Sequence, residues 1–234
     1  MKKILVTTFL MLPGVLNAAI EETASPFPSA KKGINIMSMA EINVPFAMKS
    51  HILENKKALA TKGYEETTET DKNVISLFAL QRSAEEEIKQ FDDDKNPLDT
   101  HLKSSVSKIN LAFKFNEIPN LKKHNIIGYA AVGGYAKGKG WDGMVEFMSD
   151  PKLGVCSYTT YGIEKVILDK ETTEYFVNDK PSNKSVAGNW NTGFLYTVNW
   201  YAPTRLMTLE CANKIFDPNI VDNMIMLADR IDKA

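Results

Sequence analysis

Hydrophobic and polar residues alternate along much of the second half of the chain, which is typical of strands with one buried face. The clearest case is a hairpin of residues 194–200 and 205–211, with its turn at Ala202 and Pro203. One face of it carries every second residue: Phe194, Tyr196, Val198 and Trp200 on the first strand, and Arg205, Met207, Leu209 and Cys211 on the second. The same pattern predicts further strands over residues 109–115, 126–136, 144–148, 155–161, 163–168 and 174–177.

The end of the chain carries a helix signature. Asp217 can cap the helix and Pro218 suits its first position. An apolar stripe then recurs at helical spacing through Ile220, Val221, Met224, Leu227, Ala228 and Ile231. Because so wide a stripe must be covered, we expect this helix to pack across the preceding sheet.

The first half of the chain is less regular. A helix is predicted over residues 43–63, with Gly63 as its stop. Residues 64–91 fit one helical face, and they fit a hairpin of strands 63–69 and 73–80 followed by a helix over 83–91 equally well. We favour the hairpin.

Together these patterns predict an α+β fold: a twisted antiparallel sheet with a C-terminal helix across it, preceded by a helical N-terminal part. The acidic segment 91–100 (FDDDKNPLDT) is the best boundary between an N-terminal part, residues 39–100, and a C-terminal part, residues 101–234. The boundary is short, so one domain over both parts is an alternative.

The N-terminus resembles an export signal. Lys2 and Lys3 precede an uncharged run over residues 4–16, and Ala18 and Ala19 offer cleavage sites. The run is shorter than the roughly 20 residues that cross a bilayer. We expect a signal peptide over residues 1–18, of the kind found in bacteria, then a flexible leader over 19–38, and a periplasmic or secreted product.

Composition restricts the partners. Without Lys2 and Lys3, 26 basic residues face 29 acidic ones, a net charge of −3, which argues against general binding of nucleic acid. No second apolar run is long enough to span a membrane, so we expect a soluble mature chain.

The two cysteines, Cys156 and Cys211, are expected to form a disulfide in an oxidising compartment. It would close a loop of about 56 residues, which the chain-entropy model rates at roughly 4 kcal/mol. The alternative is a catalytic thiol. Neither cysteine lies in a C-x-x-C pair, so a thioredoxin-type role lacks support.

Two aromatic residues are candidates for partner contact. Trp141 lies in GKGWDG, residues 138–143, which matches G-x-G-x-x-G but has strand-like sequence on both sides, so a glycine-rich hairpin loop is predicted rather than a nucleotide site. Lys139 and Asp142 flank this tryptophan. Trp190, in the polar segment 187–193, is the second choice. The competing interpretation of Trp141 is an ordinary core residue.

Motifs for catalysis and metals are weak. Asp92, Asp94 and Asn96 match the start of a calcium loop, but Pro97 and Lys103 occupy its glycine and glutamate positions. The histidines, His51, His101 and His124, have no ligand at zinc-motif spacing. No G-x-S-x-G elbow occurs. We therefore expect no cofactor and no metal.

The leading hypothesis is an exported, non-enzymatic protein that binds a protein or a small molecule, in host or envelope interaction. One alternative is an exported hydrolase whose site is assembled from scattered Asp, His and Ser residues. Another is a haem or metal carrier, with histidine ligands and either Tyr129 or Tyr135.

Overall fold

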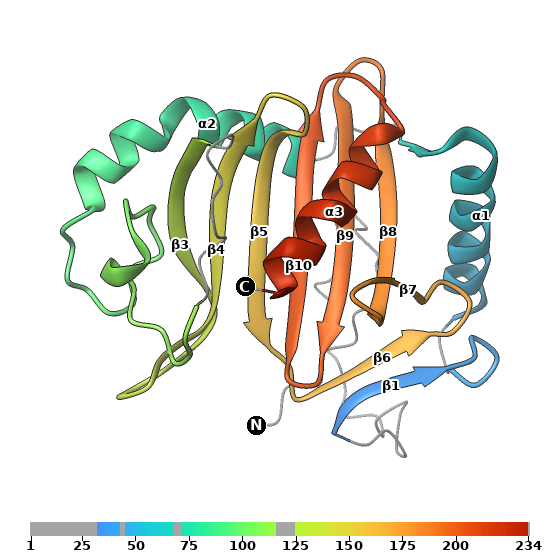
Figure 1. Cartoon of the computed structure of the whole chain (residues 1–234), viewed down its shortest axis with the longest axis horizontal. Coiled ribbons are helices and arrows are strands. Elements are labelled where there is room, and N and C mark those ends of the chain that lie inside the picture. The colour runs from blue at the N-terminus through green and yellow to red at the C-terminus, as the bar shows by residue number, and fades with distance from the viewer. Residues whose placement is uncertain (1–31, 43–44, 68–71, 116–124, 234) are drawn as a thin grey trace.

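The computed structural model describes residues 32–42, 45–67, 72–115 and 125–233 (Figure 1). The predicted signal peptide, residues 1–18, and His124 lie outside them. Within the described residues the helices are α1 (Phe46–Lys62), α2 (Lys72–Phe91), the 3-10 helix η1 (Val106–Lys108) and α3 (Asn219–Lys233). The strands are β1 (Gly33–Met37), β2 (Glu65–Glu66), β3 (Asn125–Ala136), β4 (Gly140–Asp150), β5 (Gly154–Gly162), β6 (Lys165–Asp169), β7 (Glu174–Val177), β8 (Lys180–Asn189), β9 (Gly193–Ala202) and β10 (Arg205–Asn213).

Most of the described strands form one large sheet. Its order is β2-β8-β9-β10-β5-β4-β3, and β7 pairs with β8 beside this path. Its pairings are antiparallel except that of β2 with β8. A separate pair, β1 and β6, is parallel. The fold is α+β, which confirms the prediction from alternation.

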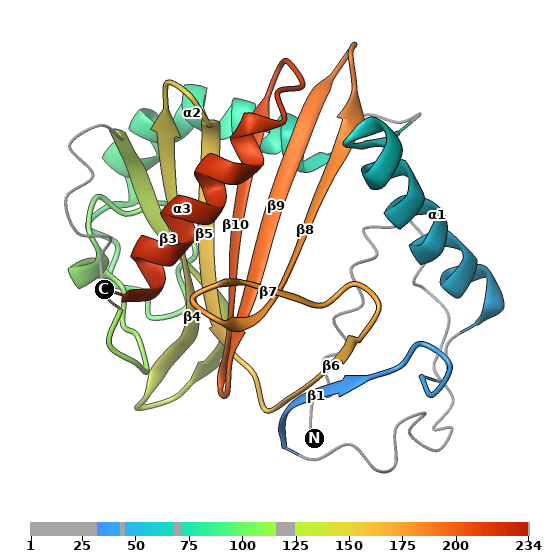
Figure 2. The same ribbon diagram turned by 45° about the vertical axis from the view of Figure 1, so that its right-hand side comes forward.

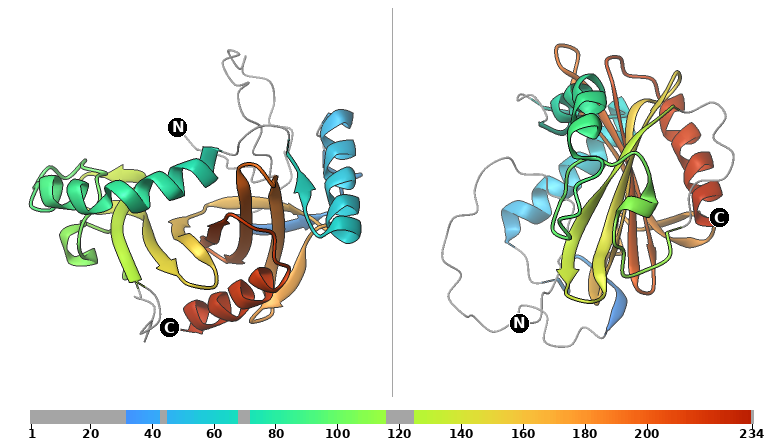
Figure 3. Two further views of the ribbon diagram at one scale, coloured as in Figure 1. Left: turned by 90° about the horizontal axis from the view of Figure 1, so that it is seen from above. Right: turned by 90° about the vertical axis from the view of Figure 1, so that its left-hand side faces the viewer.

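The helix α3 lies across one face of the sheet, as its apolar stripe predicts (Figure 3). Asp217 caps it, accepting a hydrogen bond from the Asn219 backbone N–H at 2.9 Å. The stripe is buried in one core with the inner face of β9, which includes Tyr196 and Trp200. At the far end of α3, Trp200 Nε1 donates to Asp232 Oδ1 at 3.2 Å, so the helix is held by hydrogen bonds as well as by packing.

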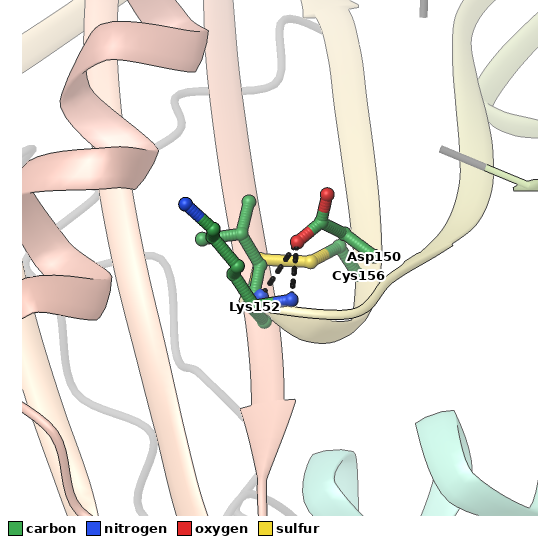
Figure 4. Close-up of a disulfide and its surroundings, with 5 residues drawn as sticks. Asp150, Lys152 and Cys156 are labelled. Atoms are coloured by element: carbon green, nitrogen blue, oxygen red, sulfur yellow. Dashed lines mark hydrogen bonds between the residues drawn. A yellow bond between two sulfur atoms is a disulfide. The ribbon is translucent and has the colours of Figure 1, made fainter. Parts of the chain in front are cut away.

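The predicted disulfide joins β5 to β10 within the same core (Figure 4). Cys156 and Cys211 are directly opposite each other in the register, and their Cα atoms lie 4.0 Å apart. Both side chains are fully buried. In the adjacent β4–β5 turn, Asp150 Oδ1 accepts from the backbone N–H groups of Lys152 and Leu153. The disulfide connects the strand near residue 156 to the last strand, which confirms the prediction.

Residues 72–91 form the single helix α2, so the favoured hairpin over 63–69 and 73–80 is wrong. Of the described residues in these two ranges, only Glu65 and Glu66 are in a strand. The helical spacing prevails because it places Val74 and Leu77 together against Val155, Leu195 and Ala212 of the sheet. Further along α2, Ala84 packs on Ala130 and Val145.

The predicted strand over residues 109–115 is also wrong. This segment follows η1 as a loop, with one isolated bridge between Leu111 and Trp141. Its alternating apolar residues pack without forming a strand. The Arg205 guanidinium carbon lies over the Phe113 ring, 3.4 Å from the ring centroid, and Phe115 packs beside Tyr158.

The expected leader over residues 19–38 ends in a strand. Gly33–Met37 is β1, which pairs in register with β6, from Gly33 opposite Lys165 to Met37 opposite Asp169. The apolar side chain of Ile34 packs with Val166 and Leu168. This end of the leader therefore joins the folded body, and residues 19–31 lie outside the described part of the chain.

Candidate functional site

A well-formed cavity lies in a groove between α1 and the edge of the sheet at β8. Its volume is about 470 Å³. Figure 2 shows α1 beyond β8, at the end of the sheet opposite β3. The walls come from α1 and from β8, and the loop between β6 and β7 closes one end. Leu195 and Thr197 of β9 and Val221 of α3 also line the groove, so the site is assembled from parts of the chain that are far apart in the sequence.

The groove exists because α1 does not dock on the sheet along its whole length: Leu59, near its end, packs against the core. Gly63 ends the helix in the left-handed conformation, with φ of 81°, and its N–H donates to the Leu59 carbonyl at 3.1 Å. The chain then turns directly into β2, which pairs with β8 at Ala187 and Gly188. None of the described side chains of α1 is fully buried. The helix is anchored at its end, and its inner face borders the groove.

Polar side chains of α1 and β2 form a small network in the groove. Asn55 Nδ2 lies 3.2 Å from His51 Nε2, and His51 Nε2 lies 3.8 Å from Glu65 Oε1. Partial burial raises the pKa of the Glu65 carboxyl, and His51 and Asn55 partly oppose that shift. Glu65 therefore presents a partly desolvated carboxyl to the groove.

The loop between β6 and β7 closes the groove through Glu171. Its carboxylate accepts hydrogen bonds from the Met39 backbone N–H at 2.9 Å and from the Ser38 hydroxyl at 3.2 Å. Its carbonyl accepts from Lys56 Nζ of α1. One residue thus connects the loop after β1, the β6–β7 loop and α1.

Part of the sheet side of the groove is polar, and its side chains are hydrogen-bonded to one another. Asn199 Nδ2 donates to Asn183 Oδ1 at 2.8 Å, and Thr208 donates to Asn199 Oδ1 at 2.7 Å. Tyr201 lies at the end of this row, 3.4 Å from Asn183 Nδ2, and burial raises its pKa to about 12. Asn183 itself borders the groove, so the hydrogen bond from Asn199 holds this part of the groove wall in place.

The predicted glycine-rich hairpin is present as β3 and β4, but its loop is shorter than expected and does not include Trp141. The β3–β4 turn comprises only residues 137–139, and Trp141 is the second residue of β4. Its indole Nε1 donates to the Pro97 carbonyl at 3.0 Å, and its ring meets Tyr135 edge-on with centroids 5.5 Å apart. Gly140, with φ of 101°, allows the backbone of residue 110 to approach closely, because a Cβ at position 140 would lie 2.4 Å from the Asn110 carbonyl oxygen.

The flanking candidates also have assigned places. Lys139 is exposed in the β3–β4 turn. Asp142 is exposed in β4, where its Oδ1 accepts from the Gly134 backbone N–H at 2.6 Å. Its carboxylate thus supports the bulge between β3 and β4.

Trp190 lies in a shorter loop than expected, because residues 187–189 belong to β8 and the turn covers only 190–192. Its side chain is 62% exposed and rests edge-on against Phe194, with centroids 5.2 Å apart. Trp141 and Trp190 lie at opposite ends of the sheet, at the β3–β4 and β8–β9 turns (Figure 1). The structure does not bring these two candidates together.

The remaining catalytic and metal candidates are dispersed. His101 Nδ1 lies 2.5 Å from Asp99 Oδ1, but the nearby Ser104 hydroxyl donates to Asp92 at 2.8 Å instead. In the described residues, no group of three His, Cys, Asp or Glu side chains is placed to hold a metal ion. The hydrolase and the haem or metal carrier stay predictions.

Comparisons with protein families, with curated proteins and with solved structures found no match to this chain. None of the helices in the described ranges is both long and apolar enough to cross a membrane. The disulfide is consistent with an oxidising compartment.

Sequence reasoning missed the groove because it missed β8. Residues 180–185 (KPSNKS) are too polar to show the alternation of a half-buried strand. The opposite wall did leave a signal, since His51, Asn55 and Leu59 follow one another at the i, i+4 spacing of one helix face. This spacing shows that the three residues share one face of the helix, but it does not show that this face borders a groove.

Proposed function

We propose that this protein is an exported, non-enzymatic binding protein that holds its partner in the groove between α1 and β8. The observation that carries the proposal is the position of α1, which leaves a cavity of about 470 Å³ between an ordered strand and a half-buried helix face. That volume is in the range of known ligand sites. Export follows from the signal sequence and agrees with the disulfide.

The chemistry of the walls favours binding over catalysis. The polar side chains of the groove already interact with one another, as in the Asn55–His51–Glu65 network and the Asn199–Asn183 pair. Groups held in this way can orient a ligand without offering an activated nucleophile. Apolar residues such as Ile52 and Leu59 add surface that a ligand can cover.

The test uses two libraries as probes: small organic fragments and random nine-residue peptides. Binding is followed by backbone amide chemical shifts of the isotope-labelled protein. We expect the shifted amides to cluster on α1 and β8. Ala60 borders the groove and Ala47, on the same helix, does not, so Ala60→Trp should abolish binding while Ala47→Trp preserves it.

Shifts confined to the surroundings of Trp141 or Trp190 would refute the proposal, as would binding that Ala60→Trp leaves intact. The absence of any binder from both libraries would count against it equally. Export is checked separately by mass spectrometry of the product outside the cytoplasm, which should begin at Ala19 or Ile20.

A further inference from the structure

We infer that the partner held in the groove is an extended polypeptide, which adds to the sheet as a strand along β8. This inference rests on the proposed function and specifies its ligand. It is carried by the pairing of β8, because the two strands on its outer side leave a gap between them.

The gap follows from the register. On the outer side of β8, β2 pairs only with Ala187 and Gly188, and β7 pairs with Lys180 and Ser182. Among the described strands, none pairs with the outer side of residues 183–186. On the inner side, β9 pairs with β8 without interruption from residue 182 to residue 189. The gap therefore lies in a regular strand.

The direction of the backbone groups in the gap can be derived. The Gly188 carbonyl points outward, since it accepts from the Thr67 N–H of β2 at 3.1 Å. In an antiparallel ladder, the N–H and C=O of one residue point to the same side, and the sides alternate along the strand. Val186 and Lys184 therefore direct their N–H and C=O groups outward, into the gap.

Two donors and two acceptors at this spacing match the backbone of another extended chain. The four residues of the gap span about 13 Å at 3.3 Å per residue. Across the groove, α1 offers apolar contacts from Ile52 and Leu59 to the side chains of such a strand. A compact apolar ligand would fill the volume without pairing these backbone groups.

The charges on the walls favour a basic peptide. Acidic residues outnumber lysines among the lining side chains: Glu65, Asp169, Glu171 and Glu174 against Lys56 and Lys184. Each of these carboxylates has a partner: Asp169 accepts from Thr172, Glu171 accepts from Met39, and Glu174 lies 3.8 Å from Lys184. The Glu65 carboxyl lies 3.8 Å from His51 Nε2 and is hydrogen-bonded to Asn55. Neither of these partners is a lysine or an arginine, so we assign Glu65 to a basic side chain of the peptide.

The experiment takes the tightest peptide selected from the random nine-residue library as its probe. Single backbone N-methylations are introduced along that peptide. Methylation at alternate residues, whose amides would face β8, should weaken binding about tenfold each, as loss of a hydrogen bond predicts. Methylation at the residues between them should have much less effect. The amides of Lys184 and Val186 should exchange more slowly with the peptide bound.

A protein variant gives an independent measurement. Lys184→Pro removes an outward N–H, which edge strands tolerate, whereas Lys184→Ala removes the side chain and keeps that N–H. We expect the Pro variant to bind the peptide about tenfold more weakly than the Ala variant. If the Pro variant does not fold, the N-methylated peptides on the unmodified protein decide the question.

Other outcomes separate this inference from the proposed function. Peptide binding that Ala60→Trp blocks but N-methylation does not alter would keep the groove and overturn strand addition. Selection of small fragments alone at the groove would do the same. Slow exchange of the Lys184 amide that depends on protein concentration, without peptide, would identify a second copy as the occupant and overturn the inference. Failure of any ligand to reach the groove would overturn both proposals.

Discussion

The helices α1 and α3 have similar lengths, 17 and 15 residues, but opposite relations to the sheet. α3 buries Ile220, Met224, Leu227, Ala228 and Ile231 across one face. α1 buries none of its described side chains and exposes Leu53 and Phe46. The physical difference lies in the pattern: the apolar residues of α3 form one stripe, whereas those of α1 are spread around the helix.

This contrast separates stability from binding. A helix with a continuous stripe is part of the core, because its docking removes apolar surface from water. A helix without one is held by its end and by a few polar contacts, and it leaves space beside the sheet. In this protein, that space is the groove. Residues of α3 should therefore affect folding, and those of the inner face of α1 should affect binding.

The largest effect is expected from the disulfide beneath α3. Replacing Cys156 and Cys211 together with alanine should lower the free energy of unfolding by about 4 kcal/mol, since the unfolded chain loses a crosslink over 55 residues. Urea unfolding, followed by circular dichroism, measures the loss. A change below about 1 kcal/mol would contradict the central place of this region in stability.

A matched pair of leucines compares the helices directly. Leu227 of α3 is 1% exposed and Leu53 of α1 is 53% exposed. Leu227→Ala should cost about 3 kcal/mol through the cavity it creates, and Leu53→Ala less than about 0.5 kcal/mol, as for a surface residue. Thermal and urea unfolding of both variants provide the measurement. Equal losses would mean that α1 is docked in solution.

A smaller loss than that of Leu227→Ala is expected in the loop after α2, which is held by charged side chains rather than by an apolar stripe. Burial opposes ionisation of Asp99, but Lys103 and His101 outweigh it and lower the pKa of Asp99 from 3.8 to about 2. The folded state thus prefers the carboxylate, so the associated stability is complete above about pH 4 and is lost as the pH falls towards 2. We expect a loss of about 1–2 kcal/mol.

The control for this titration is Asp99→Asn, which cannot titrate at that position. The free energy of unfolding of the unmodified protein should fall more steeply between pH 4 and pH 2 than that of the variant. Using the difference between the two curves removes the contribution of Asp92, whose pKa is also about 2. Parallel curves would show that Asp99 is not coupled to folding.

Much of the C-terminal part could be predicted because its patterns are long and local. The 194–211 hairpin and α3 each carry an apolar periodicity that only one element satisfies, and they follow the chain as expected. The disulfide was predictable because the chain contains only Cys156 and Cys211. The predictions for residues 64–91 and 109–115 were wrong because short apolar runs fit more than one kind of element. Their tertiary contacts decided which structure these residues adopt.

The sequence by itself determined the α+β class, the last hairpin, the capped C-terminal helix and the cysteine pair, since each depends on local spacing or on residue type. The groove, the ordered setting of Trp141 and the gap along β8 were decided only by the tertiary structure. His51 of α1 and Glu65 of β2 are close in the sequence, whereas the opposite wall, at Lys184 and Val186, comes from more than 100 residues later. Their juxtaposition depends on the register of the whole sheet, which no local pattern contains.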